Sequence, residues 1–401
     1  MKSKTRNMTI LTGLAMFKMF FGAGNIVFSL AIGLYAKDMN IWALLGLLIT
    51  AVIMPFIGVI AMSLYKGDTK DFFSRAGKIP GFFISLFILA LIGPFGAIPR
   101  CLTLSHSTLN MLLPNLSLWL FLLCICGFIF FCTVKKNRLM QILGYVFAPA
   151  LIGLIAVIIV KGLWSAPPVG HSDLTVGNAF AHGLLEGYNT LDLLPAFFFS
   201  SVVVSLLKKN QPEYFEGEGS ERRLFKVMVK ASAIGALLIG GIYIGFSFLA
   251  AHYQETLIGL PQEVLFSSLA WTILGPWGGA FTCLAVLVSC IATSIALTAV
   301  FSDFIHKEVF KERYDYRIWL VVTLAIAFAF CFVGFAGIVK NLAPILQICY
   351  PALLMLTMLN IFHKIFRIRF GVRIAVPVTF LGTWLVQNPT WPAKMMKFFA
   401  R

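Results

Sequence analysis

Charged residues are scarce in this chain. Only 12% of its 401 residues are Asp, Glu, Lys or Arg, whereas soluble domains carry roughly 25%. Acidic residues are the rarer kind, with 16 Asp and Glu against 32 Lys and Arg. The polar segments between the apolar runs are too short to fold alone. This composition excludes a soluble globular protein and predicts a single transmembrane domain over residues 1–401, all-α and polytopic.

Motifs of enzyme chemistry are also absent. The sequence contains no phosphate-binding GxxxxGK[ST] loop, no HExxH zinc motif and no GxSxG nucleophile motif. None of its eight cysteines has paired metal-ligand spacing with histidine. We therefore expect no enzyme activity, no catalytic residue, no ATP-driven pump, no disulfide, no structural metal and no cofactor other than a transported ion.

Apolar runs of membrane-spanning length recur along the chain. A helix needs about 20 apolar residues to cross a bilayer. The last run is short, so it predicts either a span or a partial, re-entrant piece. We expect no cleaved signal peptide before the first run. Eleven runs approach the required length: 12–35, 41–64, 81–105, 116–134, 140–160, 190–207, 227–251, 276–301, 318–339, 342–362 and 374–387.

The basic residues predict the orientation of these runs. With the N-terminus inside and each run crossing once, 23 of the 32 Lys and Arg lie inside, six outside and three within runs. This asymmetry follows the positive-inside rule. The net charge of +16 is thus explained by the orientation of the chain in the membrane. We expect contact with lipid but no nucleic-acid partner. The C-terminal tail either lies outside or rests on the membrane surface. Nothing in the sequence fixes an oligomeric state.

The first run is interrupted at mid-depth by Gly22, Ala23, Gly24 and Asn25. Glycine in a helix interior is unfavourable by about 1 kcal/mol relative to alanine. Broken backbone inside a bilayer must be satisfied by protein, water or ligand. Freed amides would suit an anionic group, and freed carbonyls a cation. The alternative is close helix packing through small residues.

The sixth run combines polar and aromatic residues. Pro195 removes a backbone donor, and we expect the run to be interrupted beyond it, at 197–201. Phe198 and Phe199 offer apolar surface, whereas Ser200 and Ser201 offer hydroxyls. An aliphatic amino acid needs both surfaces. The alternative is a simple kink with core aromatics.

Polar groups also lie within other runs. Thr293 and Ser294 are adjacent hydroxyls deep in the eighth run, where they suit a cation or bond back to their own helix. Charged residues inside spans are functional hypotheses by default, and Lys18, Arg100 and Asp192 are of this kind. The Lys18 ammonium could substitute for a bound cation. For all three, the alternative is that the side chain reaches a membrane interface.

The order of the runs has a weak internal symmetry. Five runs start from the inside with a broken first helix, and five follow in the opposite orientation with a broken first helix. This outline is typical of an inverted repeat, in which the substrate site lies at the paired breaks. The repeats would span about 10–162 and 187–363, followed by a C-terminal helix and tail at 364–401.

Five stretches together resemble the bacterial branched-chain amino acid carriers of the BrnQ type. Each stretch alone is only weakly specific, but the combination is specific because the stretches occur in the expected order and span nearly the whole chain. They are FFGAGNIVF (20–28), GPFGAIPR (93–100), LGYVFAPALIGLI (143–155), GYNTLD (187–192) and CIATSIALT (290–298).

The resemblance implies a cation-coupled symporter for leucine, isoleucine and valine in a bacterial cytoplasmic membrane. It implies the LeuT-like fold, with two inverted five-helix repeats and discontinuous helices 1 and 6. The main chain at Phe21, with Thr293 and Ser294, would hold the cation. The residues implied to bind substrate are Gly22, Ala23, Gly24, Asn25, Phe198, Phe199, Ser200 and Ser201.

Two departures from the family pattern keep alternatives open. The family usually has twelve spans, whereas about eleven are predicted here. Lys18 stands where a small or apolar residue is expected, which makes H⁺ coupling or exchange an alternative to Na⁺ symport. The alternative functions are a carrier of another neutral or aromatic amino acid, and, less favoured, a channel or a non-transporting membrane scaffold.

Overall fold

The fold is helical throughout the part that the structure describes. The computed structural model describes residues 2–134, 152–215, 217, 219–366 and 371–387. A further helix covers Ile152–Trp164. The labelled helices are α1 (Lys2–Phe20), α2 (Ala23–Ala36), η1 (Lys37–Met39), α3 (Asn40–Leu48), η2 (Ile49–Ile53), α4 (Met54–Leu64), α5 (Thr69–Ser74), α6 (Lys78–Ile92), α7 (Ala97–Asn110), α8 (Leu118–Val134), α10 (Val176–Asn189), α11 (Leu193–Asn210), α12 (Pro212–Phe215), α13 (Ser220–His252), α14 (Gln254–Leu257), η3 (Gln262–Val264), α15 (Leu265–Phe304), η4 (Ile305–Val309), α16 (Tyr316–Cys331), α17 (Phe335–Phe366) and α18 (Val372–Gln387).

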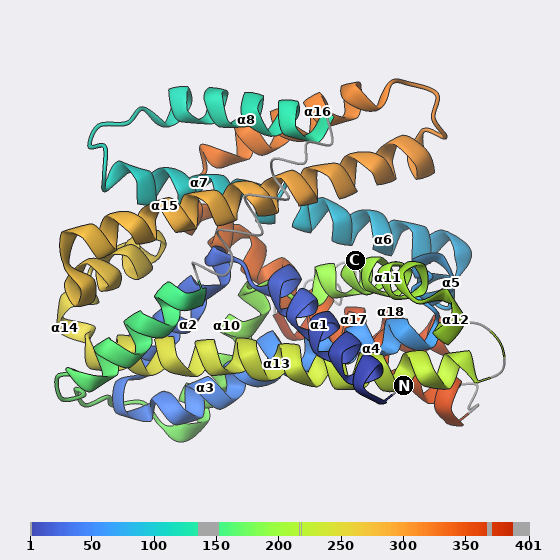
Figure 1. The fold of residues 1–401 in the computed structure, drawn as a ribbon, viewed down its shortest axis with the longest axis horizontal. Helices are drawn as coiled ribbons and strands as arrows, with labels where there is room; N and C mark the ends of the chain where they lie inside the picture. Colours follow the sequence, from blue (N-terminus) through green and yellow to red (C-terminus); the bar gives the residue numbers. More distant parts are fainter. Residues whose placement is uncertain (1, 135–151, 216, 218, 367–370, 388–401) are drawn as a thin grey trace, which may run out of the picture.

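The first span is broken where the sequence predicts it. Helix α1 ends at Phe20 and α2 begins at Ala23. Between them Gly22 is extended, with φ −115° and ψ 146°. Figure 1 shows the two half-helices meeting near the middle of the molecule's long axis. The prediction of a discontinuous helix 1 is confirmed.

The sixth span is also discontinuous, but its break lies earlier than predicted. Helices α10 and α11 form one bent span, with an angle of 50° between them. The break covers residues 190–192, whereas 197–201 are regular helix within α11. Pro195 lies in the first turn of α11, where proline is tolerated because that turn's amides have no intrahelical acceptor. It therefore marks the start of a half-helix, and the expected interruption at 197–201 is wrong.

Helices also occupy segments that were expected to be polar connections. Helix α10 lies in the stretch before the predicted sixth run, and the expected repeat boundary at 187 falls inside it. The first part of α15, before Gly275, lies in the connection before the eighth run. Gly275 has φ 75° and interrupts α15 there. Both helices are shorter or more polar than a full span, so an apolar-run criterion misses them.

The described residues contain five helical stretches long and apolar enough to cross a membrane, or six with the bent pair. Four shorter apolar helices accompany them: Leu118–Val134, Ile152–Trp164, Tyr316–Cys331 and Val372–Gln387. A multi-pass membrane protein follows, although the expected count of about eleven spans is not confirmed. The start of the run at 140–160 and the tail after 387 lie outside the described residues.

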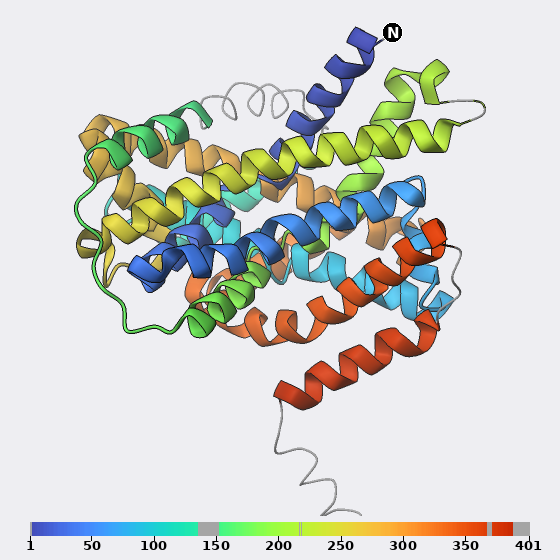
Figure 2. The ribbon, with the colours of Figure 1, turned by 90° about the horizontal axis from the view of Figure 1, so that it is seen from below.

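The half-helices are held between longer helices. Helix α13 packs against both α1 and α2, and α15 packs against α2 and α7. Figure 2 shows α18 on the outer side of α17, at the edge of the molecule. Buried apolar residues form three clusters, containing Phe20 of α1, Ile26 of α2 and Leu193 of α11 respectively. The breaks in the first and sixth spans therefore lie where the three clusters meet.

Candidate functional site

The break in the first span exposes main-chain groups. The amide of Phe21 still donates to the Phe17 carbonyl at 2.7 Å, and Asn25 N–H donates to the Gly22 carbonyl at 3.0 Å. A Cβ built on Gly22 would have no atom within 4 Å. Ala23 and Gly24 form the first turn of α2, and the structure describes only their main chain. The start of α2 thus directs amides and a positive helix end toward open space.

Asn25 joins the two breaks. Its Nδ2 donates to the carbonyl of Phe20 at 3.1 Å, which is the last residue of α1. The same Nδ2 donates to Oδ1 of Asp192 at 2.6 Å. One side chain therefore ties the end of α1, the start of α2 and the break in the sixth span together.

Asp192 lies inside the fold and not at an interface. It is 5% exposed and sits in the break between α10 and α11. Its Oδ2 accepts a hydrogen bond from the Tyr243 hydroxyl at 3.3 Å, and Tyr243 lies on α13. The interface alternative for Asp192 is wrong, because the chain continues as helix α10 on the far side of the break.

Arg100 is the second buried charge at this place. It is 5% exposed, on α7, and its Nη1 donates to the Asn189 carbonyl at 2.6 Å. Asn189 is the last residue of α10, so the guanidinium caps a helix C-terminus, where positive charge is favoured. Its Cζ also lies 5.5 Å from the centroid of the Phe28 ring on α2. The sequence marked Arg100 as unusual but did not connect it to the breaks.

The predicted residues of α11 lie on two sides of that helix. Phe199 approaches the break in the first span, with its ring centroid 5.6 Å from that of Phe20. Phe198 lies over Phe73 of α5, with a centroid distance of 6.3 Å. Ser200 donates to the Val59 carbonyl on α4 at 3.1 Å, and Ser201 donates to the Gly67 carbonyl. The structure brings Phe199 to the break and directs both serine hydroxyls toward the α4 end.

The predicted cation residues are spread over two elements. The main chain of Phe21 follows the end of α1, and its ring stacks on Phe17 at a centroid distance of 5.1 Å. On α15, the Thr293 hydroxyl donates to the Ser289 carbonyl at 3.1 Å. The Ser294 hydroxyl donates to the Cys290 carbonyl at 2.9 Å. Donation back to the helix uses each hydroxyl hydrogen and leaves oxygen lone pairs available.

Lys18 lies in the last turn of α1 and its side chain is exposed. A cation in the last turn of a helix interacts favourably with the negative end of the helix dipole. This position is one turn before the break, as the sequence indicates. The Lys18 side chain therefore stands near the end of the half-helix whose carbonyls would face a cation.

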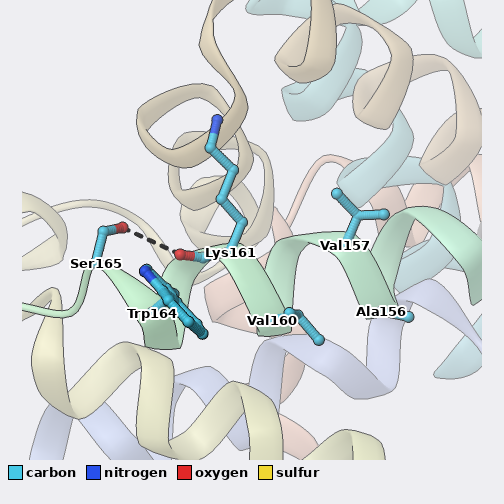
Figure 3. Close-up of a pocket in the computed structure, with 6 residues that line it drawn as sticks. All are labelled: Ala156, Val157, Val160, Lys161, Trp164 and Ser165. Atoms are coloured by element: carbon cyan, nitrogen blue, oxygen red, sulfur yellow. Dashed lines mark hydrogen bonds between the residues drawn. The ribbon is translucent and has the colours of Figure 1, made fainter.

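Two surface hollows differ in their relation to the breaks. Figure 3 shows that six residues of one exposed helical face, from Ala156 to Ser165, line the first hollow; Trp164 there is 91% exposed. Such an outward face with an interfacial tryptophan suits lipid contact. The second is a groove of about 390 Å³ between α1 and α11. It is lined by Asn7, Met8, Leu11, Thr12, Ala15, Met19, Val203, Leu206, Leu207 and Gln211. Of these two hollows, the second runs along the two half-helices.

The sequence of this chain is similar to those of known membrane transport proteins. The sequence matches the family described as branched-chain amino acid transport protein over residues 5–394. It is 28% identical over 379 residues to the branched-chain amino acid permease BraB of Bacillus subtilis (strain 168), covering 92% of this chain and 82% of BraB. It is 30% identical over 381 residues to the permease BrnQ of the same strain, covering 91% and 83%.

Two solved structures share the architecture at low sequence identity. The inward-facing conformation of Mhp1 aligns with a TM-score of 0.62 at 13% identity, covering 88% of this chain and 76% of that chain. A manganese transporter from Eremococcus coleocola aligns with a TM-score of 0.57 at 12% identity, covering 98% and 88%. These likenesses concern the fold alone, and they confirm the LeuT-like class predicted for the chain.

Proposed function

The chain belongs to the branched-chain amino acid transport protein family, and from this membership we propose that it imports leucine, isoleucine or valine, coupled to Na⁺, by alternating access. Its relatives are permeases and not enzymes. The observation that carries the proposal is the pair of helix breaks joined by the 2.6 Å hydrogen bond from Asn25 to Asp192. Paired breaks near mid-membrane are where transporters of this design bind substrate.

The substrate would lie against the open backbone of the first span. Its carboxylate would accept hydrogen bonds from amides at Gly22, Ala23 and Gly24, at the positive end of α2. Phe199 lies beside Phe20 at this break and would contact an aliphatic side chain. The proposed site is completed by Asn25, Phe198, Ser200 and Ser201. The two serines would act indirectly, because their hydrogen bonds to α4 and Gly67 position α11.

The coupling ion would bind where the first and eighth spans meet. Helix α15 packs against α2, which supports oxygen ligands from the Phe21 carbonyl, Thr293 and Ser294. Because cation and substrate would stabilise the same broken segment, each would raise the affinity of the other by the same factor. Lys18, one turn away, would compete electrostatically with the ion.

The proposed direction of transport rests on the positive-inside rule, with the N-terminus in the cytoplasm. The groove between α1 and α11 runs along both half-helices, and in this orientation it would open to the cytoplasm. It would form part of the release path. Exchange of access between the two sides would then involve α1 and α11 moving relative to α13 and α15.

Uptake of radiolabelled leucine into proteoliposomes, with Na⁺ and pH gradients imposed separately, tests the proposal. We expect Na⁺-driven uptake, and a rise of about tenfold in the Na⁺ concentration for half-maximal uptake in Thr293→Ala, equivalent to about 1.4 kcal/mol. Thr272→Ala is the matched control, because Thr272 lies on the same helix and also bonds to its i−4 carbonyl, at 3.0 Å, but is exposed. Uptake that does not respond to Na⁺ would contradict Na⁺ coupling.

Asp192 supports a second candidate, H⁺ coupling. It is a buried carboxylate in the break of the sixth span, linked to the first break through Asn25, and the side chains of Asn25 and Tyr243 that donate to it are neutral. Protonation would change its bond to Asn25 and thus the link between the breaks. If H⁺ is the coupling ion, an inward H⁺ gradient should drive leucine uptake without Na⁺ in the same assay. In Asp192→Asn, uptake should no longer depend on the H⁺ gradient.

A further inference from the structure

The guanidinium of Arg100 is only partly satisfied by the protein. Its Nη1 donates to the Asn189 carbonyl at 2.6 Å, but its Nε and Nη2 are buried without a hydrogen-bond partner among the described residues. A buried charged donor without an acceptor is strongly unfavourable. In a membrane protein such a group usually marks a ligand or ion pathway.

The two unpartnered nitrogens have a specific shape. Nε–H and Nη2–H lie on the same edge of the guanidinium plane and form a fork that matches the two oxygens of a carboxylate. In the described part of the chain no carboxylate forms an ion pair with Arg100. Glu186, on the neighbouring turn of α10, instead accepts a hydrogen bond from Asn189 Nδ2 at 3.0 Å. Within the described ranges, then, no acceptor faces the open edge, and the edge is available to a bound ligand.

Asn189, the residue whose main chain contacts the Arg100 guanidinium, adds an unpartnered acceptor. Its main-chain oxygen is the group that Arg100 caps, while its side-chain Oδ1 is buried and has no hydrogen-bond partner in the part of the chain that the structure describes. A simple anion would satisfy the guanidinium but not an amide oxygen. A zwitterionic α-amino acid supplies a carboxylate for the first and an ammonium donor for the second.

The location joins this pair of groups to the substrate path. Asn189 ends α10 immediately before the break that contains Asp192, and Asp192 is bonded to Asn25 in the first turn of α2. Arg100 itself lies 5.5 Å from the Phe28 ring, one turn further along α2. The guanidinium of Arg100 is thus beside both broken spans.

We propose that the Nε/Nη2 edge of Arg100 is a binding site for the α-carboxylate of the transported amino acid, with Asn189 Oδ1 accepting from its ammonium. This inference rests on the proposed transport function and adds a side-chain anchor to the main-chain amides at Gly22–Gly24. It makes Arg100 a determinant of specificity for free α-amino acids over their carboxyl-blocked analogues.

Ligand-induced thermal stabilisation of the purified full-length protein in Na⁺ buffer tests this inference, with leucine and leucinamide as ligands. Leucinamide keeps the ammonium and side chain but lacks the carboxylate. In Arg100→Gln we expect leucine affinity to fall about 10- to 100-fold, as for loss of a charge-assisted hydrogen bond, and leucinamide affinity to change less than about threefold. Arg100→Lys should fall between, since an ammonium cannot form the fork.

The control is Arg317→Gln, which removes an exposed arginine at the start of α16 and should leave both affinities unchanged. A structural role for Arg100, or a bound inorganic anion such as chloride, would lower both affinities together. A leucine-to-leucinamide ratio in Arg100→Gln or Arg100→Lys equal to that of the wild type overturns the inference.

A measurement on the wild type covers the case in which neither variant folds. Modification of Arg100 by phenylglyoxal, followed by peptide mass spectrometry, should be slowed by leucine and not by leucinamide. Equal modification under both conditions overturns the inference. If the wild type itself does not bind leucine, the proposed transport function fails, and that outcome is distinct from loss of the Arg100 site alone.

Discussion

At the scale of single residues, Asn25 is the direct link between the interrupted helices. Its amide satisfies the Phe20 carbonyl, which has no intrahelical partner at the end of α1, and it also binds the Asp192 carboxylate. Hydrogen bonds to a charged group contribute about 1.5–3 kcal/mol each. The relative position of the two breaks therefore depends on this one side chain.

Replacing Asn25 by Ala should weaken leucine binding about 10- to 100-fold, because the Asp192 carboxylate loses a donor and the breaks are no longer held together. Leucine affinity of the purified protein, measured by thermal stabilisation, gives the effect. Asn178→Ala, at an exposed position in the first turn of α10, should have none.

A double-mutant cycle separates this link from the individual roles of its members. Asn25→Ala and Asp192→Ala should be non-additive, with a coupling free energy of about 1.5–3 kcal/mol for leucine binding. Additive losses would mean that Asn25 and Asp192 act independently, and would remove the link as the organising contact of the site.

At the scale of elements, α10 is positioned by a close approach to α3. A Cβ on Gly183 would overlap the main-chain carbonyl of Ala43, and one on Gly46 would overlap the carbonyl of Phe180. Small residues that allow backbones this close are the usual means of joining helices in membranes. Because α10 carries Asn189 at its end, this contact sets the position of the break in the sixth span.

Gly183→Ala should destabilise the protein by about 1–3 kcal/mol, because the colliding atom is main chain and cannot move aside. Gly177→Ala is the matched control: the same substitution in the same helix, where an added Cβ has no atom within 4 Å. The midpoint of thermal unfolding in detergent should fall only for Gly183→Ala. Equal midpoints for both variants would contradict the close contact between α3 and α10.

The sequence predicts one break and misplaces the other for a physical reason. Glycine at 22 and 24 makes the first interruption visible, since glycine leaves helical geometry at low steric cost. The second break contains no glycine or proline, and Leu191 adopts the left-handed region there, with φ 64°. Only tertiary packing selects that conformation for leucine, so no local signal marks it.

The buried charges were misjudged for a related reason. Arg100 and Asp192 lie near one end of the predicted runs 81–105 and 190–207, and a charge near the end of a run suggests a membrane interface. The helices continue past both: α7 extends from Ala97 to Asn110, and α10 precedes Asp192. The depth of a charged residue in the membrane depends on whether the chain continues as helix beyond it, and hydropathy does not show this.

At the scale of the whole molecule, the fold persists at 12% and 13% identity to the two solved structures. The arrangement of half-helices between long helices requires only apolar faces and small residues at crossings. The contacts among Asn25, Arg100, Asn189 and Asp192 come from three different parts of the chain: α2, α7, and the end of α10 with the break that follows it. Orientation in the membrane, in turn, depends on all spans together.

Labelling of single introduced cysteines in intact cells tests that orientation. Asp173 lies in the exposed segment before α10, and Lys311 follows η4 at an exposed position. Three predicted spans separate them, so they should face opposite sides. With the N-terminus inside, Asp173→Cys should react with a membrane-impermeant maleimide from outside, and Lys311→Cys only after permeabilisation. The parent protein, whose eight cysteines are all free, supplies the background. The reverse pattern would place the N-terminus and the α1–α11 groove outside, and labelling of both from one side would exclude an odd number of crossings between them.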